Sequence, residues 1–222
     1  MVERTPKFAV RKKAASTRPA PSERVDDRRG ERREAILAAA LEEFSARGFA
    51  ATRLDDVAAR AGVAKGTIYL YFEDKESLFQ ELVRAMVVPL AGSIAAAPLR
   101  EMPIRTVLDM IVEAFVTQIF ATRRKDVMRL IIAEGPRFPK LAEFYYREVI
   151  ARVFPVLRAR LKLAVERGEL HHGALARFPQ LLAAPAVMAL VWSGLFDRFE
   201  PLDVRGLLRA HLEVLLGQGG ER

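Results

Sequence analysis

The stretch "AGVAKGTIYLYF" (Ala61–Phe72) decides the fold, because only part of it suits a protein interior. Ile68 and Phe72 lie about one helical turn apart, so they can face inward together. The residues of the same helix that must then face elsewhere are small, polar or aliphatic: Gly66, Thr67, Tyr69 and Leu70. This pattern is typical of a helix whose outer side meets a second surface.

The sequence before this stretch predicts two helices. From Glu31 onward, apolar residues recur at helical spacing, and Arg47–Gly48 supplies a stop. The apolar stripe consists of Ile36, Leu37, Ala40, Leu41 and Phe44. Thr52 is the predicted N-cap of a short second helix, since Asp55 follows three residues later in an approximate capping box.

The sequence from Gly62 onward predicts a turn and two more helices. Gly62 takes the turn position, where a positive φ costs a glycine little. The third helix is predicted over Lys65–Phe72, and Asp74 is the predicted cap of a fourth. Two short helices joined by an Ala-Gly-Val turn are typical of a helix-turn-helix. A plain helical hairpin is the alternative, but the complete motif favours DNA binding.

The outward side chains of the third helix suit a DNA groove. Gly66 lets a backbone approach closely, and the hydroxyl groups of Thr67 and Tyr69 can donate to phosphates. Leu70 can meet an apolar base feature such as a thymine methyl group. Lys75 adds a positive charge beside the free amides that begin the next helix. The motif therefore predicts contact with double-stranded DNA.

The segment "GFAATRLDDVAARAGVAKGTIYLYFEDKESLF" (Gly48–Phe79) resembles the TetR family of transcriptional regulators. The resemblance implies an all-α homodimer, in which an N-terminal three-helix helix-turn-helix domain precedes a larger helical domain for ligand binding and dimerisation. Motif and resemblance together place these residues at or near DNA: Thr52, Arg53, Lys65, Gly66, Thr67, Tyr69, Leu70, Tyr71 and Lys75. Ala64 departs from the family pattern, which often has a capping serine there, and Leu70 stands where a polar or basic residue is common.

The bulk composition bounds the class of protein. Of 222 residues, 51% are hydrophobic and none is cysteine, which excludes disulfides and thiolate metal sites. No uncharged apolar run reaches membrane-spanning length, and the basic N-terminus lacks the apolar core of a secretory signal. The composition is typical of a soluble cytoplasmic protein, and no membrane partner is predicted.

The net charge of +8 is unevenly distributed along the chain. Residues 1–30 hold nine Lys/Arg against four Asp/Glu, whereas residues 31–82 hold seven against ten. A DNA-binding segment with an acidic excess must place a few cations well instead of relying on bulk charge. Residues 1–29 lack apolar periodicity and are expected to form a disordered basic arm, with the helix-turn-helix domain over residues 30–82.

Residues 83–218 are predicted to form the helical ligand-sensing and dimerisation domain. Helices are expected over Ile104–Ala121 and from Pro139 onward, the second with a kink at Pro155. The segment Pro179–Phe196 is apolar on nearly all sides, so it must be covered on all sides. We expect one face to pack on its own domain and another on a second subunit; burial within a monomer is the alternative.

A ligand sensor needs a cavity. The residues expected to line it are apolar or aromatic: Met110, Phe115, Ile119, Met128, Phe138, Tyr145, Trp192 and Phe196. For any one of them core packing is the commoner role, since apolar residues at helical spacing usually pack in a core. Asp109, Glu113 and Glu134 are candidate polar anchors for a ligand, with solvated helix faces as the alternative.

The sequence contains no pattern typical of a catalytic nucleophile, a metal site or a nucleotide phosphate loop. No enzyme activity, metal or cofactor is therefore predicted. The predicted function is a ligand-responsive transcriptional regulator, a repressor released from a pseudo-palindromic operator by a small, mostly apolar effector. The alternative is a helical small-molecule binding protein with a vestigial DNA-binding head.

Overall fold

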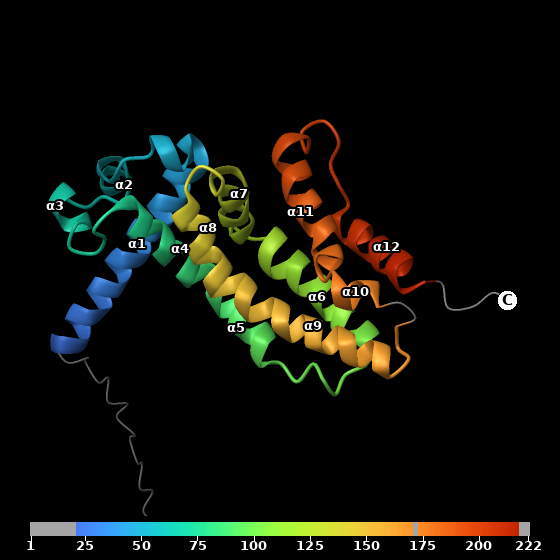
Figure 1. The fold of residues 1–222 in the computed structure, drawn as a ribbon. Coiled ribbons are helices and arrows are strands. Elements are labelled where there is room, and N and C mark those ends of the chain that lie inside the picture. The colour runs from blue at the N-terminus through green and yellow to red at the C-terminus, as the bar shows by residue number, and fades with distance from the viewer. Residues whose placement is uncertain (1–20, 171–172, 218–222) are drawn as a thin grey trace, which may run out of the picture.

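The regular elements of the described chain are all helical, as predicted. The structure is a computed structural model that describes residues 21–170 and 173–217. Figure 1 shows the first four helices at one end of the molecule and the last two at the other. We refer to the first four as the head: α1 (Pro21–Ala51), α2 (Leu54–Arg60), α3 (Lys65–Ile68) and α4 (Lys75–Met86).

The predicted stop, turn and fourth-helix cap of the helix-turn-helix are confirmed. Gly48 has a φ of 75°, which breaks the helical backbone of α1 where the sequence predicts a stop. Gly62 has a φ of 67° in the turn between α2 and α3, a conformation that strains any residue with a side chain. The Asp74 carboxylate accepts from the Ser77 backbone amide at 2.7 Å, so Asp74 caps α4. Ala64 begins α3 without a side-chain cap.

Two predicted boundaries in the head are wrong. α1 begins at Pro21, so residues 21–29 are helical and do not belong to a disordered arm. The rest of that predicted arm, residues 1–20, lies outside the described residues. α3 ends at Ile68, because the backbone amides of Leu70 and Tyr71 donate to carbonyls three residues back and so tighten the chain into a turn.

The remaining helices form the body. They are α5 (Val88–Ala96), α6 (Ile104–Ala114), α7 (Arg124–Glu134), α8 (Pro139–Tyr145), α9 (Ala151–Glu166), α10 (Ala174–Arg177), α11 (Gln180–Leu195) and α12 (Val204–Leu216). Two π-helical segments interrupt them: η1 (Phe115–Phe120) continues α6, and η2 (Tyr146–Ile150) joins α8 to α9. The break expected at Pro155 lies earlier, because the chain changes to π-helical bonding at η2 and α9 runs through the proline.

The head and the body share one core. Buried apolar side chains of α1 to α4 pack with Val127 of α7 and with Leu141 and Phe144 of α8. The ring of Phe49 in the head lies 4.7 Å, centroid to centroid, from the ring of Phe138 just before α8. A second core lies among α6, α9, α10, α11 and α12. Because the first core includes α7 and α8, a displacement of α7 would change the packing of the head helices.

No single helix among the described residues is long and apolar enough to cross a membrane. Only α4 and α5 taken together, bent by 41°, meet that requirement of length and composition.

Candidate nucleic-acid interface

The outer side of α3 and of the turn after it is uncovered by the described chain. Leu70 is 77% exposed and Tyr69 is 50% exposed, whereas Ile68 and Phe72 are buried. A Cβ atom added to Gly66 would meet no other atom within 4 Å, so the helix presents open space there. The division into an inner and an outer side, predicted from the sequence, is confirmed.

Two predicted DNA neighbours add positive charge near this side. The Nζ of Lys65 donates to Oδ2 of Asp55 at 2.7 Å. That hydrogen bond, together with the carboxylate charge, raises the pKa of Lys65 above its ordinary value. Arg53 occupies the N-cap position of α2, and its side chain is exposed. Thr67 and Tyr71 are half-buried, so they present only part of their surface.

Thr52 is buried, and its hydroxyl group serves the end of α1. The Oγ1 atom donates to the carbonyl oxygen of Gly48 at 2.8 Å and lies 3.2 Å from that of Glu43. The predicted N-cap role is therefore wrong, because the hydroxyl group satisfies the last carbonyls of α1 instead of the first amides of α2. With 2% of the residue exposed, the Thr52 side chain is withdrawn from the surface.

Lys75 holds a corner of the head together. Its ammonium group donates to the carbonyl oxygens of Phe49 at 2.9 Å and Ala50 at 2.8 Å, and lies 3.4 Å from that of Thr52. It also lies 4.9 Å from the centroid of the Phe49 ring, which attracts a cation. The charge that the motif assigns to a DNA phosphate is thus engaged by the protein's own backbone.

Two arginines of α1 lie beside the outer side of α3, and sequence reasoning missed both. Arg29 and Arg33 line a hollow of about 300 Å³, which we name the Arg29 notch; its other lining residues are Gly30, Leu70 and Tyr71. The sequence interpretation started the helix at Glu31 and so left Arg29 in an arm. The signal was present, since positions 29 and 33 continue the stripe that begins at Ile36.

The eight residues predicted to line an effector pocket lie in different parts of the body, and their role in ligand binding stays a prediction. Phe138, Met128 and Tyr145 pack in or against the shared core, where the Tyr145 hydroxyl group donates to the Met128 sulfur at 3.1 Å. Phe115 packs against the second core, and Phe196 is 43% exposed. The other three, exposed or half-buried, are Met110, Ile119 and Trp192.

The candidate polar anchors hold the protein's own elements. Oε1 of Glu134 accepts from the backbone amide of Phe49 at 3.1 Å, which fastens α7 to the head. Glu113 pairs with two arginines of α12, and Asp109 pairs with an arginine one turn earlier in α6. An apolar hollow of about 320 Å³ lies between α10, α11 and α12, lined mainly by leucines such as Leu175 and Leu215.

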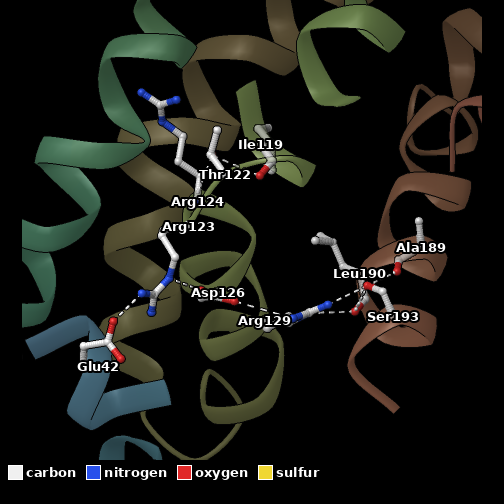
Figure 2. Close-up of polar contacts among 10 residues, drawn as sticks. All are labelled: Glu42, Ile119, Thr122, Arg123, Arg124, Asp126, Arg129, Ala189, Leu190 and Ser193. Carbon is white, nitrogen blue, oxygen red and sulfur yellow. Dashed lines mark hydrogen bonds and ion pairs between the residues drawn. The ribbon is translucent and has the colours of Figure 1, made fainter. Parts of the chain in front are cut away.

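A chain of polar contacts joins the head to α11 through α7, as Figure 2 shows. Glu42 of α1 pairs with Arg123, which lowers the pKa of Glu42 by hydrogen bonding first and by charge second. The Nε of Arg123 donates to Asp126 at 2.6 Å, and Asp126 pairs with Arg129 at 3.5 Å. Arg129 then donates to two acceptors on α11, the carbonyl oxygen of Leu190 at 3.1 Å and the hydroxyl group of Ser193 at 2.6 Å. We name these residues the α7 relay.

A helix-turn-helix with an uncovered outer side, mounted on a larger helical body, defines a DNA-binding protein. Residues 36–82 match the family described as bacterial regulatory proteins, tetR family, and residues 106–199 match the C-terminal domain of AefR-like transcriptional repressors. The chain is 33% identical over 148 residues to the HTH-type transcriptional repressor BepR of Brucella suis. The aligned region covers 63% of this chain and 69% of BepR. The chain belongs to the TetR family of transcriptional regulators.

Other relatives and solved structures agree with this assignment. The HTH-type transcriptional regulator AcrR of Shigella flexneri is 25% identical over 195 residues, or 84% of this chain and 88% of AcrR. The structure of SmeT with triclosan superposes with a TM-score of 0.69 at 21% identity, covering 85% of this chain and 93% of SmeT. The structure of Salmonella enterica GusR superposes with a TM-score of 0.63 at 25% identity, covering 83% of this chain and 95% of GusR.

Proposed function

We propose that the protein is a ligand-responsive transcriptional repressor that acts in the cytoplasm as a homodimer. The observation that carries the proposal is the uncovered outer side of α3, where Tyr69 and Leu70 stand free of the described chain. Kinship supports it, since BepR is named a repressor and SmeT is described as the repressor of a multidrug efflux pump in Stenotrophomonas maltophilia.

The proposed homodimer uses α11 and α12. The large apolar side chains exposed there are Leu181, Val187, Met188, Leu195 and Val214. Apolar surface of this kind on two adjacent helices favours burial against a second copy. A two-fold dimer would carry two α3 helices, which is what a pseudo-palindromic operator with half-sites about 34–36 Å apart requires.

We expect the protein to sediment with a mass near twice its chain mass of 24.9 kDa. Met188→Asp places a charge in the proposed apolar interface and is expected to yield monomers, because an unpaired charge is costly to bury. Tyr146→Asp is the matched control, since Tyr146 is exposed in η2, away from α11 and α12. A clean monomer of the unmodified chain at micromolar concentration would reject the dimer.

The proposed mechanism has two states. The effector-free dimer holds its two α3 helices at operator spacing, and a small, mostly apolar effector bound in the body favours a form with different spacing. The α7 relay supports this coupling, because Arg129 holds α11 while Arg123 holds α1. By linkage, DNA must weaken effector binding by the same factor, so equal effector affinity with and without DNA would contradict the coupling.

Footprinting with the purified protein tests the proposal. A repressor is expected to protect a specific sequence upstream of its own gene or of a neighbouring gene. The absence of any sequence-specific protection would favour the alternative, a small-molecule binding protein with a vestigial head.

Leu70→Ala is expected to change base preference at a single operator position. The side chain stands out from the head, so it can meet a thymine methyl group, and losing that contact costs about 1 kcal/mol at that position. Binding-site selection from a random library, run in parallel on both proteins, measures the change. An unaltered preference at every position would remove Leu70 from base recognition.

A further inference from the structure

The Arg29 notch combines two cations with the edge of the predicted DNA surface. Arg29 and Arg33 lie one turn apart on α1 and face the turn after α3. The Arg29 guanidinium carbon lies 5.9 Å from the centroid of the Tyr71 ring, so the ring helps to hold this cation at the notch. Leu70, which is 77% exposed, lines the same notch.

The charge around the notch is positive although the head as a whole is acidic. Residues 28–34 contain four arginines and two glutamates, against the excess of acidic residues over the rest of the head. Arg33 pairs with Glu81, but Glu81 is shared with Arg84, so one carboxylate faces two guanidinium groups. An anion in the notch would meet the guanidinium group of Arg29 and, beside its Glu81 partner, that of Arg33.

Gly30 lies beside the two arginines and leaves space at the notch. Glycine inside a helix is less stable than alanine. A Cβ atom added at Gly30 would meet nothing within 4 Å, so no packing within the described chain requires a glycine there. Gly30 lines the notch, so a side chain at this position would take up space beside the two arginines.

We propose that the Arg29 notch seats a backbone phosphate of the duplex on which α3 lies. The proposal rests on the proposed function and adds to it a site that positions the protein on DNA without reading bases. Guanidinium groups bind phosphate oxygens in paired, charge-assisted hydrogen bonds, and two of them converge here. We assign the occupant as a duplex because Leu70, an exposed residue of the predicted DNA surface, lines the same notch.

The test uses the full-length protein with two duplexes, one selected from a random library by the unmodified protein and one of random sequence. Affinity is measured over a series of salt concentrations. Arg29→Ala is expected to weaken binding to both duplexes about fivefold to tenfold at 0.1 M salt, and to reduce the slope of log K against log salt by about 1. The ratio of selected to random affinity should stay the same, because the contact carries no sequence information.

Arg28→Ala is the matched control. Arg28 is an exposed arginine on the same helix, does not line the notch, and carries the same charge. Its loss is expected to change affinity and slope much less than the loss of Arg29. Equal effects of the two substitutions would overturn the notch in favour of diffuse attraction, and so would an unchanged slope in Arg29→Ala.

Gly30→Leu distinguishes a loss of duplex binding at the notch from a loss of folding stability. The added side chain fills the notch, so affinity should fall while the thermal midpoint does not. Full affinity in Gly30→Leu would overturn the proposal. Saturable binding of inorganic phosphate to the DNA-free protein, abolished by Arg29→Ala while duplex affinity is unchanged, would overturn the assignment to DNA. If the unmodified protein selects no duplex at all, the proposed function fails, which is distinct from a failure of the notch alone.

Discussion

Replacement of Arg160 by methionine is expected to lower the free energy of unfolding by about 3 kcal/mol. Arg160 is 1% exposed, and its Nε donates to the carbonyl oxygen of Leu99 at 2.8 Å. Its Nη2 donates to the carbonyl oxygen of Met102 and, at 2.8 Å, to Oε2 of Glu169. These bonds tie α9 to the loop between α5 and α6. Methionine fills a similar space but donates nothing, so the buried acceptors lose their partner.

Urea unfolding followed by circular dichroism measures this effect. Arg158→Met is the matched control, because Arg158 is exposed on the same helix and the chemical change is identical. Its free energy of unfolding is expected to stay within about 0.5 kcal/mol of the unmodified protein. An unchanged unfolding midpoint for Arg160→Met would show that these contacts do not stabilise the body.

The carboxylate end of the same cluster gives a pH-dependent readout. The hydrogen bond from Arg160, and next that from the backbone amide of Ile104, lower the pKa of Glu169 below its ordinary 4.5. A carboxyl group whose pKa is lower in the folded state adds stability above its unfolded pKa and loses it as pH falls through the folded pKa. Glu169→Gln should therefore be less stable than the unmodified protein at pH 7, with the difference closing below pH 4.5.

The helix-turn-helix was predictable because its signals are local. The tight turn between α2 and α3 requires the positive φ of Gly62, and Asp74 caps an amide only three residues away. Ile68 and Phe72 are buried on the inner side that their spacing defines, which leaves Leu70 outside. Each of these local conformations depends on residues close by in the sequence, so a pattern of a few residues predicts it.

Thr52 and Glu134 could not be placed from the sequence, for two reasons: the Thr52 hydroxyl group can serve either of two neighbouring helix ends, and the partner of Glu134 is set by tertiary packing. A threonine before a helix is a normal N-cap, but here the end of α1 folds back and brings the carbonyl oxygen of Gly48 within 2.8 Å. Glu134 meets the amide of Phe49 only because α7 packs beside α1. No spacing rule relates positions 49 and 134, which lie 85 residues apart in the chain.

The effector pocket could not be located from the sequence for a different reason. Phe138 and Tyr145 recur at helical spacing, as residues lining a cavity also do, yet they fill the core that the head shares with the body. Periodicity tells which side of a helix is covered but not whether protein or ligand covers it. Conversely, Arg29 was missed because charged residues obscured the continuation of the α1 stripe.

Lys75→Met is expected to destabilise the head by about 2 kcal/mol and to weaken DNA binding as a consequence. The ammonium group donates to the carbonyl oxygens of Phe49 and Ala50 in the last turn of α1, where carbonyls lack helical donors. These carbonyls form the corner that leads into α2, so a loosened corner misplaces Arg53 and the helix-turn-helix behind it. Thermal unfolding and duplex affinity, measured on the same samples, test both parts.

The salt dependence of binding decides how Lys75 acts. A lysine that neutralises a phosphate lowers the slope of log K against log salt by about 1 when it is removed. A lysine that holds the corner leaves the slope nearly unchanged and lowers the thermal midpoint, the opposite of the pattern expected for Arg29→Ala. Lys65→Met is the control, because its ammonium group pairs with Asp55 at the surface and should matter little for stability. An unchanged thermal midpoint for Lys75→Met, with the slope of log K against log salt reduced by about 1, would show that Lys75 contacts a phosphate instead.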